Sequence, residues 1–152
     1  MELQTVEKKY GNPISDRCLA FAELRRYANR VIKYTQKSEG AKLEMLFSLP
    51  GIFAMEFRFL RAKVRLIKEG DAFRVMERSE KSRNLLTVTI TDASALKKMI
   101  AGKLTIHRAL AEGRLTFDGS TAFFCVLTRI CNEGDKVLLS DSRYQEAYRS
   151  EK

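Results

Sequence analysis

The period of the apolar residues changes from that of a helix to that of a strand in the N-terminal half of the chain, and few folds accommodate this change. One apolar stripe recurs at steps of three and four residues, which predicts a long helix with one buried face; it comprises Ile14, Cys18, Phe21, Leu24, Ala28, Val31 and Thr35. Further on, Phe57 and Phe59 alternate with Glu56 and Arg58, which is typical of a half-buried strand. A long helix followed by strands predicts an α+β domain.

The ends of this long helix are marked by residues that favour helix termini. Asn12 can cap the free amides of the first turn, and Pro13 tolerates the first helical position. The helix is expected to run to about Lys37 and to stop by Gly40. The segment that follows, residues 41–49, fits either a short helix or a strand.

Four segments in the middle of the chain have the composition and period of strands. Residues 53–60, 64–67 and 72–76 are expected to form a three-stranded meander, with Gly70 in the turn of the second hairpin. Residues 86–91 show the clearest alternation in the chain, because three aliphatic residues alternate with three threonines. This last segment predicts a fourth strand.

The second half of the chain predicts three helices around a short strand, and a further helix in the tail. Asp92 is placed to cap a helix over residues 93–100. The order continues with a short helix over residues 106–112, a strand over residues 114–118, and a helix that begins after Ser120 and closes at Gly134. Tyr144, Ala147 and Tyr148 occur at helical spacing, which predicts a docked helix in residues 141–152.

Length and charge narrow the class of protein. The chain has 152 residues, 45% of them hydrophobic and 31% charged, which is typical of one soluble domain. Its net charge of +9 favours acidic partners such as phosphate groups or anionic lipid, without selecting between them. The longest uncharged stretch, residues 45–55, is much shorter than the roughly 20 apolar residues of a membrane span. Residues 1–10 lack the apolar core of a secretory signal, so a cytoplasmic location is expected.

Sequence features that would indicate catalysis or a bound metal are incomplete. Gly102-Lys103 lacks the other residues of a phosphate-binding loop. His107 has no second histidine or cysteine near it in the sequence, and Cys125 and Cys131 would lie on different sides of a helix. We therefore expect no enzyme activity, no cofactor and no metal. The histidine is expected to be partly exposed, and all three cysteines of the chain are expected to be reduced packing residues.

One segment, residues 86–120, carries a more specific pattern, LTVTITDASALKKMIAGKLTIHRALAEGRLTFDGS. A strand leads into an acidic helix cap, the helix ends in Gly-Lys, a short helix with an alanine follows, and glycines bound the final strand. These features are Asp92, Gly102-Lys103, Ala109, Gly113-Arg114-Leu115 and Gly119. The segment resembles the sterol carrier protein type 2 family, and residues 52–130 are similar to it in element order. It departs from the family pattern at Arg114, usually a lysine, and at Leu110, where an aromatic residue is common.

This resemblance implies an α+β fold with a twisted sheet of about five strands and helices packed on one face. The chain would form one domain of this kind, with residues 1–12 as a tail and residues 13–37 as the long helix. In the family, sheet and helices enclose an apolar tunnel that takes fatty acids, acyl-CoA, phospholipids or sterols. Catalytic residues are not part of that site.

Ten apolar residues on the inner sides of the predicted elements are candidates for lining such a cavity. They are Phe57, Val88, Met99, Ile100, Leu110, Leu115, Phe123, Phe124, Leu127 and Ile130. The alternative is that these side chains fill the core at crystal-like density. Cavity volume discriminates between the two, because an acyl chain needs a pocket of roughly 300 Å³ or more.

Three arginines, Arg58, Arg65 and Arg74, are expected to share the solvent face of the sheet, because each alternates with apolar neighbours. They form either a solvated charged face or a contact for an anionic headgroup, a ligand phosphate or a protein partner. Nucleic acid is disfavoured as a partner, because Phe57 and Phe59 point away from Arg58. A stacking platform needs rings and cations on the same face.

The most apolar window, residues 45–55, contains a Pro-Gly break that fits either a mobile, membrane-touching lid or a core strand with a turn before it. Together the sequence features predict a non-catalytic carrier of a lipid-like small molecule, with transient contact to an anionic membrane surface. The alternative is an interaction or regulatory module. Such a module would keep the fold with a filled core and dock a protein through its basic face or its long N-terminal helix.

Overall fold

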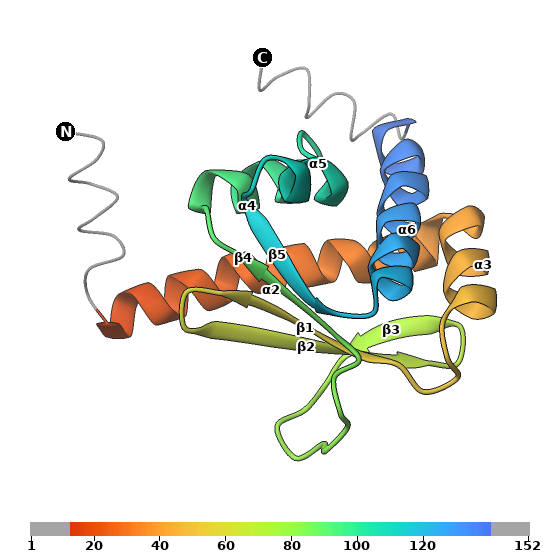
Figure 1. The fold of residues 1–152 in the computed structure, drawn as a ribbon, viewed down its shortest axis with the longest axis horizontal. Helices are drawn as coiled ribbons and strands as arrows, with labels where there is room; N and C mark the ends of the chain where they lie inside the picture. Colours follow the sequence, from red (N-terminus) through yellow and green to blue (C-terminus); the bar gives the residue numbers. More distant parts are fainter. Residues whose placement is uncertain (1–12, 141–152) are drawn as a thin grey trace.

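The computed structural model describes residues 13–140, with side chains from Cys18 to Leu139, and these residues form an open mixed sheet with helices (Figure 1). The strands are β1 (Ala54–Phe59), β2 (Ala62–Glu69), β3 (Ala72–Val75), β4 (Leu86–Ile90) and β5 (Leu115–Gly119), in the order β3-β2-β1-β4-β5. β1 and β4 pair in parallel, and the other neighbouring strands pair antiparallel. The predicted meander of three strands is confirmed, and the fourth strand adds on the other side of β1.

The described helices are α2 (Pro13–Lys37), α3 (Glu39–Ser48), α4 (Ala93–Ile100), α5 (Ile106–Ala111) and α6 (Thr121–Ser140). α2 ends at the predicted residue, and α4 has the predicted bounds. The ambiguous segment 41–49 is helical as far as Ser48, and Ser38 caps α3 by accepting a hydrogen bond of 3.1 Å from the Ala41 amide. The helix predicted in residues 141–152 lies outside the described residues.

The prediction that the last of these helices ends at Gly134 is wrong, because α6 continues to Ser140. Gly134 instead lies where α6 crosses α2. A Cβ atom at this position would lie 2.2 Å from the ring of Tyr34, a separation that real contacts do not reach. The glycine is therefore required by the close approach of two helices.

Alternation along the strands turns one face of the sheet toward the helices. The buried side chains on this face come from Met55, Phe57, Phe59, Val64, Leu66, Leu86, Val88, Ile90 and Leu115. Figure 1 shows α2 running across the sheet, with α6 beside it and α4 and α5 near one end of β4 and β5. α2 contacts β1, β2 and β3 as well as α3, α4 and α6, so the core lies between this helix and the sheet.

The N-terminal end of α2 is less buried than predicted. Ala20, Leu24, Tyr27, Ala28, Val31, Tyr34 and Thr35 form the buried stripe. Cys18 is exposed and Phe21 is 45% exposed, although both were predicted to be buried. They face the part of β2 that the short strand β3 does not cover. The side chain of Ile14 lies outside the described part of the chain.

The packing role predicted for all three cysteines holds for one of them. Cys131 is buried, whereas Cys18 and Cys125 are exposed. Cys125 follows the half-buried Phe123 and the buried Phe124 on α6, and the helical turn carries it to the solvent side. The prediction for Cys18 and Cys125 is therefore wrong, because each lies on a helix side that no described element covers.

Candidate functional site

The ten residues predicted to line a cavity all belong to the hydrophobic core or pack against it, and we call this group the apolar layer. They come from β1, β4, β5, α4, α5 and α6. Val88 is in register with Phe57 on the neighbouring parallel strand. The buried members are Phe57, Val88, Met99, Leu115, Phe124, Leu127 and Ile130, and the half-buried members that pack against the core are Ile100, Leu110 and Phe123.

Three aromatic residues that the sequence analysis did not select complete the packing of the apolar layer. Phe117 stacks on Phe124 with ring centroids 4.3 Å apart. Phe53 meets Phe123 edge to face at 5.2 Å, and Tyr27 of α2 meets Phe57 edge to face at 5.4 Å. Phe53 and Phe117 continue the alternation of β1 and β5, so extending each inner face by one position would have found them.

α5 covers the apolar layer with few buried side chains. This helix has six residues, of which Ile106 and Ala109 are buried. Gly102 before α5 and Gly113 after it both adopt left-handed backbone conformations, with φ of 75° and 73°. His107 is exposed on α5, as predicted. A short helix between two glycines is typical of an element that can open locally.

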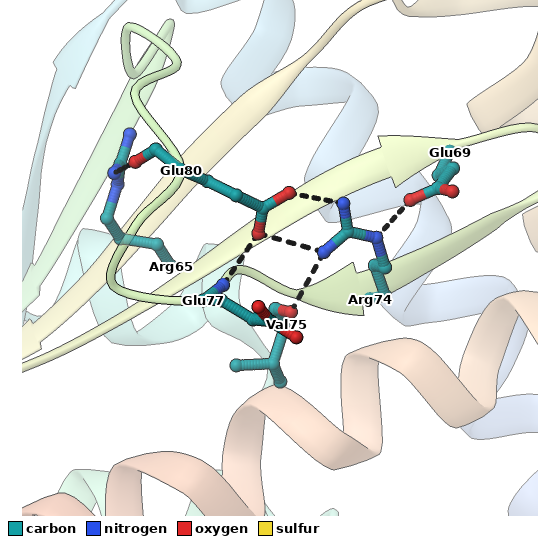
Figure 2. Close-up of polar contacts among 6 residues, drawn as sticks. All are labelled: Arg65, Glu69, Arg74, Val75, Glu77 and Glu80. Atoms are coloured by element: carbon teal, nitrogen blue, oxygen red, sulfur yellow. Dashed lines mark hydrogen bonds and ion pairs between the residues drawn. The ribbon is translucent and has the colours of Figure 1, made fainter.

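The three predicted arginines lie on the opposite face of the sheet, and each already has a partner. Arg58 pairs with Glu56, its neighbour on β1. Arg65 donates to Asn84 Oδ1 at 3.1 Å and to backbone carbonyls of the loop over residues 77–84. Figure 2 shows the guanidinium of Arg74 between Glu69 and Glu80, and its Nη1 lies 2.9 Å from Glu80 Oε2. The loop after β3 supplies most of these partners, which strand periodicity alone does not reveal.

Glu80 compensates the charge of Arg74 on the solvent face of the sheet. The hydrogen bonds from Arg74, followed by one of 2.6 Å from the Glu77 amide, lower the pKa of Glu80 to about 2. The hydrogen bonds to Glu80 and then to Glu69 raise the pKa of Arg74. At neutral pH the Arg74 charge is therefore compensated within the protein, so an external anion would have to compete with two carboxylates.

A groove with a volume of about 980 Å³ lies between the N-terminal part of α2 and β2. We call it the α2–β2 groove; its lining residues are Cys18, Phe21, Arg25, Glu56, Arg61, Ala62, Lys63, Val64, Arg65, Val75, Met76, Glu77 and Arg78. Two smaller clefts, of about 400 Å³ and 380 Å³, lie beside α3 and α6. None of the ten predicted cavity residues lines any of these three clefts.

Four cations of the α2–β2 groove differ from the paired arginines of the sheet face. Arg25, Arg61, Lys63 and Arg78 are exposed, and none of them forms an ion pair with another described residue. Sequence reasoning missed this cluster because its members come from a helix, a hairpin turn, a strand edge and a loop. Cys18 and Phe21 were predicted to be buried but are exposed, and this difference shows that this side of α2 is open.

A buried polar network joins α2 to α6. Arg30 donates to Tyr34 Oη at 2.6 Å and to Asp135 Oδ1 at 2.8 Å, and Tyr34 donates to the same Asp135 oxygen at 2.6 Å. Burial raises the pKa of Tyr34 and raises that of the Cys131 thiol to about 12. The thiol is therefore protonated at neutral pH and is a poor nucleophile. No group of three or more metal-ligating acids, histidines or cysteines occurs among the described residues.

The apolar window over residues 45–55 is divided between core and surface. Met45, Leu49, Phe53 and Met55 are buried, whereas Phe47 is 81% exposed and Ile52 is 76% exposed. The buried Lys68 of β2 donates its Nζ protons to the carbonyls of Leu49 and Pro50, at 3.2 Å each. This ammonium caps the C-terminal end of α3, where a cation is favoured. The window therefore comprises the end of α3, a turn that Lys68 holds by two hydrogen bonds, and the start of β1.

No protein-family model and no curated protein matches the chain. Among solved structures, it is similar to a crystal structure of sterol carrier protein 2, with 18% identity and a TM-score of 0.48 over 76% of this chain and 92% of the other. It is similar to the sterol carrier protein domain 2 of Helicoverpa armigera, with 22% identity and a TM-score of 0.45 over 70% of this chain and 89% of the other. It is also similar to a stereoselective inverting sec-alkylsulfatase from Pseudomonas sp., with 17% identity, a TM-score of 0.45 and coverage of 64% of this chain. The chain spans 14% of the length of that enzyme. No described helix is long and apolar enough to cross a membrane.

Proposed function

We propose that this protein binds and carries a long-chain apolar ligand, without catalysis, in a site formed by the apolar layer. The ligand class is a fatty acid, an acyl-CoA, a phospholipid or a sterol-like lipid. The observation that supports the proposal is that all ten residues selected from the sequence belong to the one hydrophobic core or pack against it. Such a site binds a long chain with about 25 cal/mol per Å² of apolar surface removed from water.

α5 is the element that we propose to move when the ligand binds. It contributes Leu110, which is half-buried and packs against the core, as Ile100 and Phe123 do. Gly102 and Gly113 can change their backbone angles with little strain, so they would act as hinges. The Arg114 Nε atom lies 3.3 Å from Asp92 Oδ2 and links the end of this segment to the start of α4. An outward shift of α5 would admit a chain between α4, α6 and the sheet.

The absence of catalysis in this proposal rests on the state of the nucleophilic side chains that the structure describes. Cys131 is buried and protonated, and His107 lies on the exposed side of α5. A nucleophile needs a base within hydrogen-bond reach, and no hydrogen bond joins His107 to a described cysteine. We therefore propose binding without bond making or breaking.

Arg58, Arg65 and Arg74 are proposed as a secondary contact for an anionic headgroup or a transient membrane surface. Their existing partners weaken this role, because a headgroup must displace Glu56, Glu69 or Glu80. We therefore expect the arginines to add little to affinity. Burial of the apolar chain supplies the larger part of the binding free energy.

Organic extraction of the purified protein, followed by mass spectrometry beside a mock preparation, tests the proposal. We expect a fatty acid, phospholipid or sterol-like species in near-stoichiometric amount. An empty extract, together with no binding of a fluorescent fatty acid at micromolar concentration, would contradict it. That result would favour the interaction module with a filled core, in agreement with the buried state of seven of the ten residues.

A matched pair of variants tests the location of the site. Leu110→Trp places a large ring at the margin of the apolar layer, and Leu43→Trp places the same ring on α3, where Leu43 is 44% exposed. We expect the first variant to bind the fluorescent fatty acid at least about tenfold more weakly, which is about 1.4 kcal/mol, and the second to bind as the wild type does. Equal binding by both would place the ligand elsewhere, with the α2–β2 groove as the next location to test.

A further inference from the structure

The outer edge of β2 is open over half of its length. β3 pairs with Leu66 to Glu69, and the last bond on this side runs from the Met76 amide to the Arg65 carbonyl, at 2.9 Å. On the opposite side of β2, the Lys68 amide donates to the Phe53 carbonyl. The backbone N–H and C=O groups of even-numbered residues of β2 therefore point toward β1, and those of odd-numbered residues point toward β3. The amide and carbonyl of Lys63 and the amide of Arg65 therefore have no backbone partner among the described residues.

This open edge forms one wall of the α2–β2 groove, and a helix forms the other. Cys18, Phe21 and Arg25 lie at spacings of three and four on α2, and all three line the groove opposite β2. A space between a strand edge and a helix is the geometry in which extended peptides add a strand to a sheet. The volume of about 980 Å³ is more than twice that of either smaller described cleft.

The two sides of an added strand would meet different surroundings. One side would meet Val64 and Val75 on the helix-covered face of the sheet, together with Phe21 of α2. The other side would meet Lys63 and Arg65, which lie on the solvent face. A strand that alternates apolar and acidic side chains satisfies both.

Charge decides which partner fits the groove. Arg25, Arg61, Lys63 and Arg78 are exposed without an ion pair to a described residue, and the acid Glu56 in the lining is engaged by Arg58. A second copy of this chain would set Lys63 and Arg65 against their own like charges, which is a known defence of strand edges against self-pairing. An acidic partner gains from the same cations.

We propose that the α2–β2 groove binds an extended acidic segment of a partner protein, which adds to the sheet as a strand beside residues 62–65 of β2. The segment alternates acidic and apolar residues over four to six positions. Its backbone bonds to the free groups of Lys63 and Arg65, and its carboxylates meet the groove cations. This site is separate from the apolar layer, so the proposal stands whether or not a lipid binds there.

Fluorescence anisotropy with a labelled eight-residue peptide of alternating valine and glutamate tests the proposal on the full chain. We expect saturable binding that weakens as salt rises, because exposed charges are screened. The same peptide with all of its backbone amides N-methylated keeps its charge but cannot donate to the ladder, and we expect it to bind at least about tenfold more weakly. A peptide with lysine in place of glutamate should not bind. Equal binding of the methylated peptide would overturn strand addition.

Variants of the protein separate backbone pairing from charge. Lys63→Pro removes the free amide and the charge, whereas Lys63→Thr removes the charge and keeps the amide, so the proline variant should bind more weakly than the threonine variant. Arg61→Glu should weaken binding, and Lys98→Glu on the exposed side of α4 should not. Thermal unfolding of each variant verifies that it is folded. Equal loss in the Lys63→Pro and Lys63→Thr variants would overturn the proposal.

Amide exchange and competing polyanions complete the test. Binding should slow hydrogen exchange at the Lys63 and Arg65 amides, because both acquire a carbonyl partner. Oligothymidylate or vesicles containing phosphatidylglycerol offer negative charge without a peptide backbone. Tighter binding of either than of the valine–glutamate peptide would overturn the assignment of a protein partner.

Discussion

The apolar layer and the α2–β2 groove occupy different parts of one sheet, and they differ in which elements cover them. At the apolar layer, β4 is paired along its whole length and α4, α5 and α6 cover the inner face. At the groove, β3 ends early, so one edge of β2 and one side of α2 remain open. The difference shows that burial of an apolar residue depends on the length of its neighbours as much as on its own helix or strand.

The largest test of this comparison makes the same substitution in both regions. Phe57→Ala should destabilise the protein by about 3–5 kcal/mol, because Phe57 is fully buried and its removal leaves a cavity. Phe21→Ala should cost less than about 1 kcal/mol, because Phe21 is 45% exposed. Urea denaturation of both variants measures the two values. Similar costs would mean that the groove is closed in solution.

The close approach of α2 and α6 gives an intermediate effect. Gly134→Ala should destabilise by about 1–3 kcal/mol, because the added methyl group overlaps the ring of Tyr34. Gly51→Ala is the control, since a Cβ atom there meets nothing within 4 Å, and it should change stability by less than about 0.5 kcal/mol. If thermal denaturation showed no loss for Gly134→Ala, the helices would be separated further than described.

The smallest effect concerns the paired arginines, in contrast with the groove cations, which form no ion pair with a described residue. The pKa of Glu80 is lowered from 4.5 to about 2, first by Arg74 and then by the Glu77 amide. A lowered pKa in the folded state means that the stabilisation is present above the unfolded value and is lost as the pH falls through about 2. A carboxyl NMR titration should find the midpoint well below 4.5. A midpoint near 4.5 would show that Arg74 is free to meet an external anion.

Much of the local structure could be predicted from the sequence. The bounds of α4, the end of α2, the β2–β3 hairpin with Gly70 in its turn and the solvent face of Arg58, Arg65 and Arg74 all follow from caps and periodicity. These signals lie within a few residues of each other along the chain. The inward orientation of the ten candidate cavity residues was predicted by the same reasoning, and each of them belongs to the core or packs against it. Their role in binding remains a proposal.

What only the tertiary structure decided depends on residues that are far apart in the sequence. α6 runs through Gly134, where the ring of Tyr34 packs too closely for any larger residue. Glu80 neutralises Arg74 because the loop after β3 folds back onto the sheet. Phe21 is exposed because β3 stops short of the part of β2 that it faces. Apart from α3, the sequence by itself determined which of the described elements form and which side of each strand is apolar, since propensity and period are local. The tertiary structure decided which of those sides are covered, because coverage depends on where the neighbouring elements begin and end.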